Sequence, residues 1–201
     1  ISGVRFLKGH GTENDFVLLP DPDGTLDLTA DLVRALCDRR AGIGADGVLR
    51  IVRSQHVDAP GEWFMDYRNA DGSIAEMCGN GVRVYARYLV TEGLADAGPM
   101  RLATRGGVKD VDVDGDAITV DMGLAVVGDA LTVDGMPATA IDMGNPHAVV
   151  HVASVSALGA LDPARKDLNV EYVEDVAPGH LRMRVHERGV GETRSCGTGA
   201  C

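Results

Sequence analysis

Two cysteines of this chain each lie in a glycine-rich loop that leads into an expected helix start. Cys78 stands in "EMCGNGVRVYARY" (residues 76–88), and Cys196 stands in "RSCGTGAC" (residues 194–201). The N-terminus of a helix lowers the pKa of a nearby thiol, and glycines let backbone N–H groups approach a carboxylate closely. The pattern therefore predicts two acid/base thiols beside a site for an anionic group.

Two such thiols suit the inversion of an amino-acid α-carbon. A thiolate removes the α-proton from one face while a thiol delivers a proton to the other, and the two exchange roles in the reverse direction. Each sulfur is expected to lie roughly 3–3.5 Å from that carbon during transfer. A single cysteine in a glycine loop is more often inert, so the hypothesis depends on the second loop. Cys37 is expected in the core, and Cys201 has no assigned role.

Composition excludes several classes of function. The chain has 201 residues, a formal net charge of −11 and 45% hydrophobic residues. This charge argues against nucleic acid or an anionic membrane as the partner. No apolar run reaches the roughly 20 residues of a membrane span, and residues 1–11 do not resemble a signal peptide, so a cytoplasmic protein is expected. CxxC and HxxxH spacings are missing, which predicts no metal site and no structural disulfides.

The hydrophobic pattern predicts an α+β fold dominated by antiparallel strands. Helices are expected over residues 29–40 and 79–93, with a short surface helix over 154–166. Hairpins are expected over residues 111–122, with Asp114-Gly115 as the turn, and over 132–142. Short apolar runs between turn residues predict strands at 16–19, 48–52, 63–67, 108–113, 117–122, 138–143, 148–152 and 181–186.

The chain also contains an internal repeat. Asn69 precedes Cys78 by nine residues, just as Glu187 precedes Cys196. An asparagine loop beside a valine-rich strand comes earlier in each half, around residues 14 and 145. The repeated order predicts two similar units, residues 1–122 and 123–201. The helix after the second loop would need more residues than the chain supplies, so the second unit is expected to be truncated at its C-terminus.

Five segments together resemble the diaminopimelate epimerase family. They are "GHGTENDF", "RRAGIGADG", "NADGSIAEMCGNGVR", "GNPHAVV" and "HERGVGETRSCGTGAC", and they run over essentially the whole chain. The resemblance implies two similar units, each a mostly antiparallel sheet wrapped around a central helix, with the active site in the cleft between them. It also implies an isomerase that interconverts L,L- and meso-diaminopimelate for lysine and peptidoglycan precursor biosynthesis, without pyridoxal phosphate, metal or another cofactor.

The resemblance also assigns roles to individual residues. Cys78 and Cys196 match the acid/base pair, and His147 and Glu187 match the groups that assist them. Arg188 suits a bidentate contact with the distal carboxylate of the substrate. The matching substrate-binding residues are Asn14, Asn69, Gly79, Asn80, Asn145, Asn169, Glu187, Arg188, Gly197 and Thr198.

Without the resemblance, each of these polar residues has a plainer interpretation. An asparagine in a glycine-rich loop is commonly a turn residue, His147 can cap backbone groups, and Glu187 can form a surface ion pair of little energetic value. The expected partner is a small amino-acid substrate, with no nucleic acid and no membrane. A homodimer is one assembly left open.

Two positions depart from the family pattern. Glu13 stands directly before Asn14, where an uncharged residue is commoner, and adds negative charge near the expected substrate. His186 stands where Trp or Tyr is expected, and is predicted to perturb the electrostatics around Cys196.

Two other functions remain open at this stage. A proline or hydroxyproline racemase of the same fold also uses paired cysteine loops, but Asn80 and Arg188 favour the epimerase. A thiol hydrolase using Cys78 with His147 would form an acyl-enzyme, and it leaves the loop of Cys196 unexplained.

Overall fold

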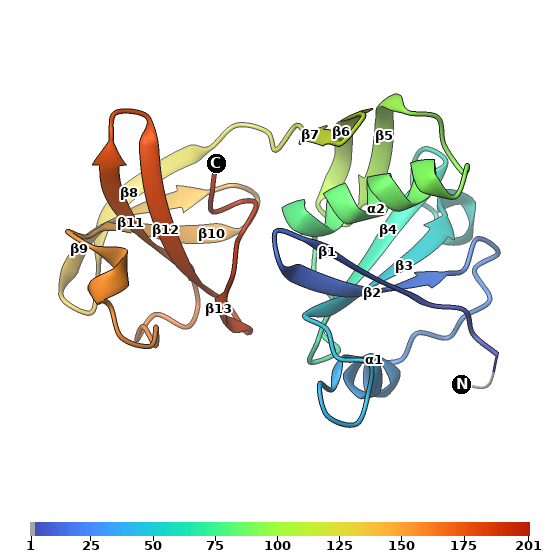
Figure 1. The fold of residues 1–201 in the computed structure, drawn as a ribbon, viewed down its shortest axis with the longest axis horizontal. Helices are drawn as coiled ribbons and strands as arrows, with labels where there is room; N and C mark the ends of the chain where they lie inside the picture. Colours follow the sequence, from blue (N-terminus) through green and yellow to red (C-terminus); the bar gives the residue numbers. More distant parts are fainter. Residues whose placement is uncertain (1–2) are drawn as a thin grey trace. The chain divides into compact units, whose positions relative to one another are not determined.

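The computed structural model describes residues 3–201. The chain divides into two compact units, with the boundary between Asp121 and Met122. Each unit is built on its own β-sheet, with seven strands in the first and six in the second (Figure 1). The predicted class, two sheet units with few helices, is confirmed.

The first unit joins seven strands in the order β1-β2-β3-β4-β5-β6-β7. Neighbouring strands are antiparallel, except that β2–β3 and β4–β5 are parallel pairs. The elements are β1 (Leu7–Gly11), β2 (Asn14–Pro20), α1 (Ala30–Cys37), β3 (Gly47–Arg53), η1 (Ser54–His56), β4 (Trp63–Asn69), α2 (Gly79–Thr91), β5 (Gly98–Thr104), β6 (Gly107–Asp114) and β7 (Ala117–Val120).

Helix α2 covers one face of this sheet (Figure 1). Val82, Tyr85 and Leu89 recur at helical spacing, are completely buried, and pack against the strands. The helix begins directly after Cys78, which is its N-cap residue, so the sheet and helix together fix the first cysteine loop.

Helix α1 lies against the opposite face. Its N-cap, Thr29, accepts a hydrogen bond from the Leu32 N–H at 3.2 Å, as the sequence predicts. Val33 and Cys37 are buried against apolar residues of β2 and β3. Burial raises the pKa of the Cys37 thiol to about 11, so this cysteine is a core residue, as predicted.

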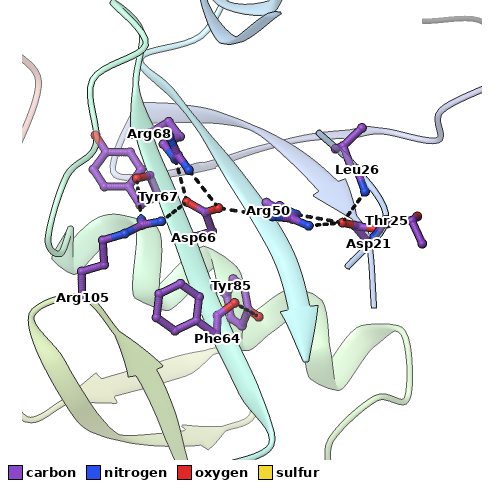
Figure 2. A network of polar contacts seen from close by, with 10 residues as sticks. All are labelled: Asp21, Thr25, Leu26, Arg50, Phe64, Asp66, Tyr67, Arg68, Tyr85 and Arg105. Atoms are coloured by element: carbon purple, nitrogen blue, oxygen red, sulfur yellow. Dashed lines mark hydrogen bonds and ion pairs between the residues drawn. The ribbon is translucent and has the colours of Figure 1, made fainter. Parts of the chain in front are cut away.

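The same face also carries a buried ionic network (Figure 2). Asp66 on β4 is 2% exposed, accepts hydrogen bonds of 2.8 Å from Arg68 and from Arg105, and lies 3.6 Å from Arg50. Arg50 also pairs with Asp21 at 2.6 Å. Burial opposes ionisation of Asp66, but the Arg68 and Arg105 guanidinium groups outweigh it and hold its pKa below the usual range. The network ties β2, β3 and β4 together.

The second unit has the strand order β13-β12-β11-β10-β9-β8, in which only β10 and β11 are parallel. Ala148, Val150, Val170 and Tyr172 pack a small core on one face of the sheet. The elements are β8 (Val126–Val133), β9 (Met136–Asp142), β10 (Pro146–His151), η2 (Val155–Ala157), β11 (Asn169–Ala177), β12 (His180–Glu187) and β13 (Gly191–Thr193).

Three local predictions for these units need comment. The helix expected over residues 154–166 is wrong, because only one short 3₁₀ turn, Val155–Ala157, forms there. Gly159 and Pro163 follow, and both disfavour a continuing helix. The β6–β7 turn is shifted by one residue to Gly115–Asp116, since Asp114 pairs with Ala117. The second hairpin is confirmed, with its turn at residues 134–135.

The two units share a pattern of strand pairing. Strands β1 to β4 pair antiparallel, parallel and antiparallel in turn, and β9 to β12 repeat that order. In the parallel pairs, Phe16 is opposite Gly47 and His147 is opposite Asn169. Counting along the strands from these pairs makes Leu49 equivalent to Glu171.

Candidate active site

The first cysteine loop is held at the N-terminus of α2. The Cys78 sulfur accepts a hydrogen bond from the Gly81 N–H at 3.4 Å, and it lies 3.6 Å from Asn14 Oδ1. Asn80 donates to the same Asn14 oxygen at 3.4 Å, and Gly79 is the buried first residue of the helix. Three predicted site residues, Asn14, Gly79 and Asn80, therefore gather around the thiol of Cys78.

Asp46 orients the amide of Asn14. Its Oδ2 accepts from Asn14 Nδ2 at 2.8 Å and from the Asp15 N–H at 3.1 Å, while Arg39 reaches its Oδ1 at 2.7 Å. Because the amide nitrogen is held by a carboxylate, the Asn14 oxygen is left facing the Cys78 thiol. The sequence analysis assigned no role to Asp46, although it lies in the glycine-rich segment "RRAGIGADG".

Asn69 and Glu13 lie in turns. Asn69 ends β4 and donates to the Ser73 hydroxyl at 3.0 Å, which is the turn role considered for it from the sequence. Glu13 and Thr12 form the two-residue connection between β1 and β2, with φ of 64° and 50°. Both residues therefore occupy the left-handed region, which is uncommon for side chains of this size.

The second cysteine loop repeats the local geometry of the first. The Ala200 N–H donates to the Cys196 carbonyl at 3.1 Å, just as the Val82 N–H donates to the Cys78 carbonyl at 2.8 Å. Each cysteine therefore opens a helical turn. The Cys196 sulfur lies 3.3 Å from the Thr198 hydroxyl oxygen.

The environment of Cys196 opposes its ionisation. The residue is 7% exposed, and burial raises the pKa of its thiol to about 12, with Glu187 and Glu171 adding to the effect. Hydrogen bonds from Thr198 and from the Gly199 N–H act in the opposite direction. The donors around this sulfur therefore decide how readily it ionises.

A row of polar side chains leads away from Thr198 into the sheet. Asn145 Nδ2 lies 3.3 Å from Thr198 Oγ1, and its Oδ1 lies 2.9 Å from His147 Nε2. His147 Nδ1 lies 2.7 Å from Glu171 Oε1. Glu171 is completely buried, and its second oxygen has no hydrogen-bond partner. The sequence analysis selected His147, Asn145 and Thr198 but missed Glu171.

The sequence model of diaminopimelate epimerase matches residues 6–127 and 139–201 of this chain.

The chain belongs to the diaminopimelate epimerase family.

One relative, the diaminopimelate epimerase of Streptomyces coelicolor, is 55% identical over 220 residues, covering 98% of this chain and 76% of that protein. The predicted family is thus confirmed, and with it the class of isomerase. Two solved structures share the fold. A phenazine biosynthesis protein of the PhzF family from Bacillus anthracis has a TM-score of 0.70 at 15% identity, covering 98% of this chain and 76% of its own. A hydroxyproline epimerase from Agrobacterium vitis has a TM-score of 0.67 at 15% identity, covering 97% and 73%.

The residues predicted to bind the distal end of a substrate lie at the start of β11 and the end of β12. Asn169 Oδ1 accepts from the Arg188 N–H at 2.9 Å, and its Nδ2 donates to the Pro146 carbonyl at 3.2 Å. Glu187 ends β12 and accepts from the Thr193 hydroxyl. The Arg188 side chain is exposed. Gly197 directly follows Cys196 in the loop.

His186 lies on the other face of β12. It pairs with Val170, whose side chain belongs to the apolar core, whereas Val185 pairs with Glu171. Because side chains alternate along a strand, Glu187 shares the face of Glu171 and His186 does not. The charged groups that act on the Cys196 thiol are therefore Glu187 and Glu171.

Within residues 3–201, no group of three or more His, Cys, Asp or Glu residues is arranged to hold a metal ion. No helix in the described part of the chain is long and apolar enough to cross a membrane. No disulfide joins the cysteines of this region.

Proposed function

We propose that the chain interconverts L,L- and meso-diaminopimelate, with Cys78 and Cys196 as the acid/base pair. The observation that carries the proposal is that both cysteines open a helical turn with the same carbonyl hydrogen bond four residues on. The name of the 55% identical relative supplies the substrate.

The reaction needs only the protons that the two thiols carry. One sulfur, as thiolate, takes the α-proton from one face of the carbon, and the other, as thiol, gives its proton to the opposite face. The bond from carbon to the first hydrogen breaks, the bond to the second forms, and the two sulfurs end with exchanged protonation states. Both thiols must be reduced, which favours the cytoplasm as the compartment.

Backbone N–H groups of the two loops would stabilise the reacting carboxylate. Gly79 and Asn80 follow Cys78, and Gly197 and Thr198 follow Cys196. N–H groups at the start of a helical turn point away from the turn and suit an anion whose charge grows as the α-proton leaves.

The distal end of diaminopimelate distinguishes it from smaller amino acids. Arg188 is exposed, and its backbone N–H is held by Asn169, so its guanidinium is available for a carboxylate. Glu187, on the neighbouring residue, would accept a hydrogen bond from the distal ammonium group. Proline has neither group, which favours the epimerase over the racemase of the same fold.

The experiment that tests the substrate is α-proton exchange in D₂O. The reduced protein is incubated with L,L-diaminopimelate and, in parallel, with L-proline, and both are followed by proton NMR. We expect deuterium incorporation and meso product with diaminopimelate alone. Exchange with proline alone would assign the chain to the racemase activity, and silence from the folded protein with both would reject the proposal.

The experiment that tests the thiols is substitution of each cysteine. Cys78→Ala and Cys196→Ala should each lower the rate of meso product formation by about 10²–10⁴-fold, the usual contribution of one acid/base group. Cys37→Ala is the matched control, since that thiol is the buried last residue of α1, and it should stay active. Near-normal turnover by either single variant would exclude the two-thiol mechanism.

A further inference from the structure

A directional hydrogen-bond chain connects the buried carboxylate of Glu171 with the sulfur of Cys196. It runs from Glu171 Oε1 to His147 Nδ1 (2.7 Å), from His147 Nε2 to Asn145 Oδ1 (2.9 Å), from Asn145 Nδ2 to Thr198 Oγ1 (3.3 Å), and from Thr198 Oγ1 to Cys196 Sγ (3.3 Å). We propose that Glu171 is a positioning residue, which sets the direction of this chain so that the Thr198 hydroxyl donates to the Cys196 sulfur.

The direction follows from the types of the partners. An ionised Glu171 only accepts hydrogen bonds, and so does Asn145 Oδ1, so both ring nitrogens of His147 must donate. In the proposed chain both ring nitrogens of His147 therefore carry a hydrogen, and the 2.7 Å separation from Glu171 is typical of a strong hydrogen bond. The Nε2–H group in turn holds the Asn145 amide with its oxygen toward the ring.

The orientation of the Asn145 amide affects the Cys196 thiol through the hydroxyl group of Thr198. Asn145 presents its NH₂ group to Thr198 Oγ1, which accepts that hydrogen bond. The hydroxyl hydrogen of Thr198 is then directed to its other neighbour, the sulfur of Cys196. A donated hydrogen bond favours the thiolate over the thiol.

Removing the charge of Glu171 would reverse the direction of the hydrogen bonds between His147 and Thr198. A neutral His147 with its proton on Nδ1 would leave Nε2 as an acceptor, and the Asn145 amide would turn its NH₂ group toward the ring. The Asn145 oxygen would then face Thr198 and accept its hydroxyl hydrogen. The Cys196 sulfur would lose its donor.

Packing alone does not explain a glutamate at this position. Its equivalent in the first unit is Leu49, which is completely buried against α2. A buried carboxylate with one unpartnered oxygen costs stability, yet the second unit makes room for it. A Cβ atom on Gly199 would lie 3.0 Å from Glu171 Cδ and closer still to Oε1, so this glycine leaves space for the carboxylate.

The other ionisable groups on this face are few. Besides His147 and Glu171, they are Glu187, from β12, and Cys196 itself. The negative charges of Glu187 and Glu171 both disfavour the Cys196 thiolate. The inference rests on the proposed function only in giving the Cys196 sulfur a part in proton transfer. Its tests need no substrate, so a failure here is distinguishable from a failure of the proposed function.

The first test measures how fast iodoacetamide alkylates Cys196, by quantitative mass spectrometry of its peptide at fixed pH. Below the thiol pKa, this rate is proportional to the thiolate fraction. Thr198→Val, which removes the hydroxyl, should lower it about tenfold or more, the effect of losing one hydrogen bond to a charged atom. Glu171→Gln should lower it similarly, and Thr198→Ser should keep the wild-type rate. Glu174→Gln, on the same strand, is the matched control.

Combining the variants tests whether they act through one chain. Because Glu171 is proposed to act through Thr198, the double variant Glu171→Gln/Thr198→Val should be no slower than Thr198→Val alone. A folded Glu171→Gln protein with an unchanged Cys196 rate would overturn the inference. Multiplicative losses in the double variant would also overturn it.

The second test observes His147 directly. In ¹⁵N-histidine-labelled protein, the His147 signals are assigned by their loss in His147→Gln. We expect two protonated ring nitrogens at neutral pH in the wild type and one in Glu171→Gln. A single protonated nitrogen in the wild type, or two in the variant, would contradict the proposed direction of the chain.

Discussion

The two cysteine loops share the same carbonyl hydrogen bond but pack against different side chains of the sheets. Beneath the loop of Cys78, Gly81 packs against Leu49, and a Cβ there would lie 3.3 Å from a leucine methyl group. Beneath the loop of Cys196, the equivalent Gly199 packs against the carboxylate of Glu171. One thiol loop therefore packs on an apolar side chain and the other on a buried carboxylate.

The difference shows how one duplicated arrangement supplies two unlike thiols. In each loop the N–H of the glycine three residues on, Gly81 or Gly199, donates to the cysteine sulfur. What differs is the second source of hydrogen bonds: Asn14, held by Asp46, near Cys78, and Thr198, held through Asn145 and His147, near Cys196.

The largest effect is expected when the first unit receives the glutamate that the second unit has at the equivalent position. Leu49→Glu buries a carboxylate under α2 with no cation beside it, and should reduce the free energy of unfolding by about 3–5 kcal/mol. The single tryptophan, Trp63, is buried on β4 and reports this unit in urea titrations. Leu49→Met is the control and should cost less than about 1.5 kcal/mol. Equal midpoints for the two variants would show that the first unit accepts a charge there.

A smaller effect is expected from the buried carboxylate that the first unit does contain. Asp66 lies on the face opposite α2, so Asp66→Asn should reduce stability by about 1.5–3 kcal/mol at pH 7 without changing the alkylation of Cys78. The pKa of Asp66 is lowered by folding, so its contribution is present above the unfolded value of about 3.9 and is lost as the pH falls through the folded value.

Urea titrations of wild type and Asp66→Asn at several pH values check this dependence. The difference between the two proteins should be full at pH 6–7 and should shrink steadily below about pH 4. A difference that grows on acidification would mean that burial, not the arginines, dominates the ionisation of Asp66.

The smallest and most specific effect comes from the paired glycines. Gly199→Ala must displace the Glu171 carboxylate, and should cost about 1–3 kcal/mol and slow the alkylation of Cys196. A Cβ on Gly81 would lie 3.3 Å from the flexible end of Leu49 and at ordinary contact distance from Cys78, 3.4 Å from its Cβ and 3.6 Å from its sulfur. Gly81→Ala also gains helix propensity of about 0.5–1 kcal/mol, so stability should not fall, and alkylation of Cys78 should change less than that of Cys196 in Gly199→Ala. The comparison fails if the two variants behave alike.

Much of the scaffold was predictable, because local signals and the final structure agree. Thr29 caps α1, the glycine after Cys78 opens α2, and alternating apolar residues mark more than half of the strands. Strands β1, β5, β11 and β13 were not predicted. Strand β8 was missed except for its last residues, because Val126 and Val127 are exposed and a Gly-Asp pair interrupts the pattern. The helix expected over 154–166 failed for the opposite reason, since its apolar spacing outweighed Gly159 and Pro163.

The residues of the site that stand in sequence motifs were predictable, but the buried strand residue that packs against the second cysteine loop was not. The cysteines, His147 and the loop asparagines stand in recognisable segments, whereas Glu171 stands in the strand sequence "NVEYVEDV". No strand was predicted over this segment; the structure places Glu171 in the middle of five consecutive buried strand positions, where a charged residue must have a partner. Which partner it has depends on the parallel pairing of β10 with β11, and that pairing joins residues more than twenty positions apart.

The period-two alternation of β11 limits how this chain can change by insertion or deletion. Shifting the strand by one residue would place Val170 or Tyr172 beneath Gly199 and drive Glu171 into the apolar core. Single-residue gaps between His147 and Glu171 must therefore be absorbed in the connection over residues 152–168. Lineages of this protein should vary in length there and keep the count of residues within the strands.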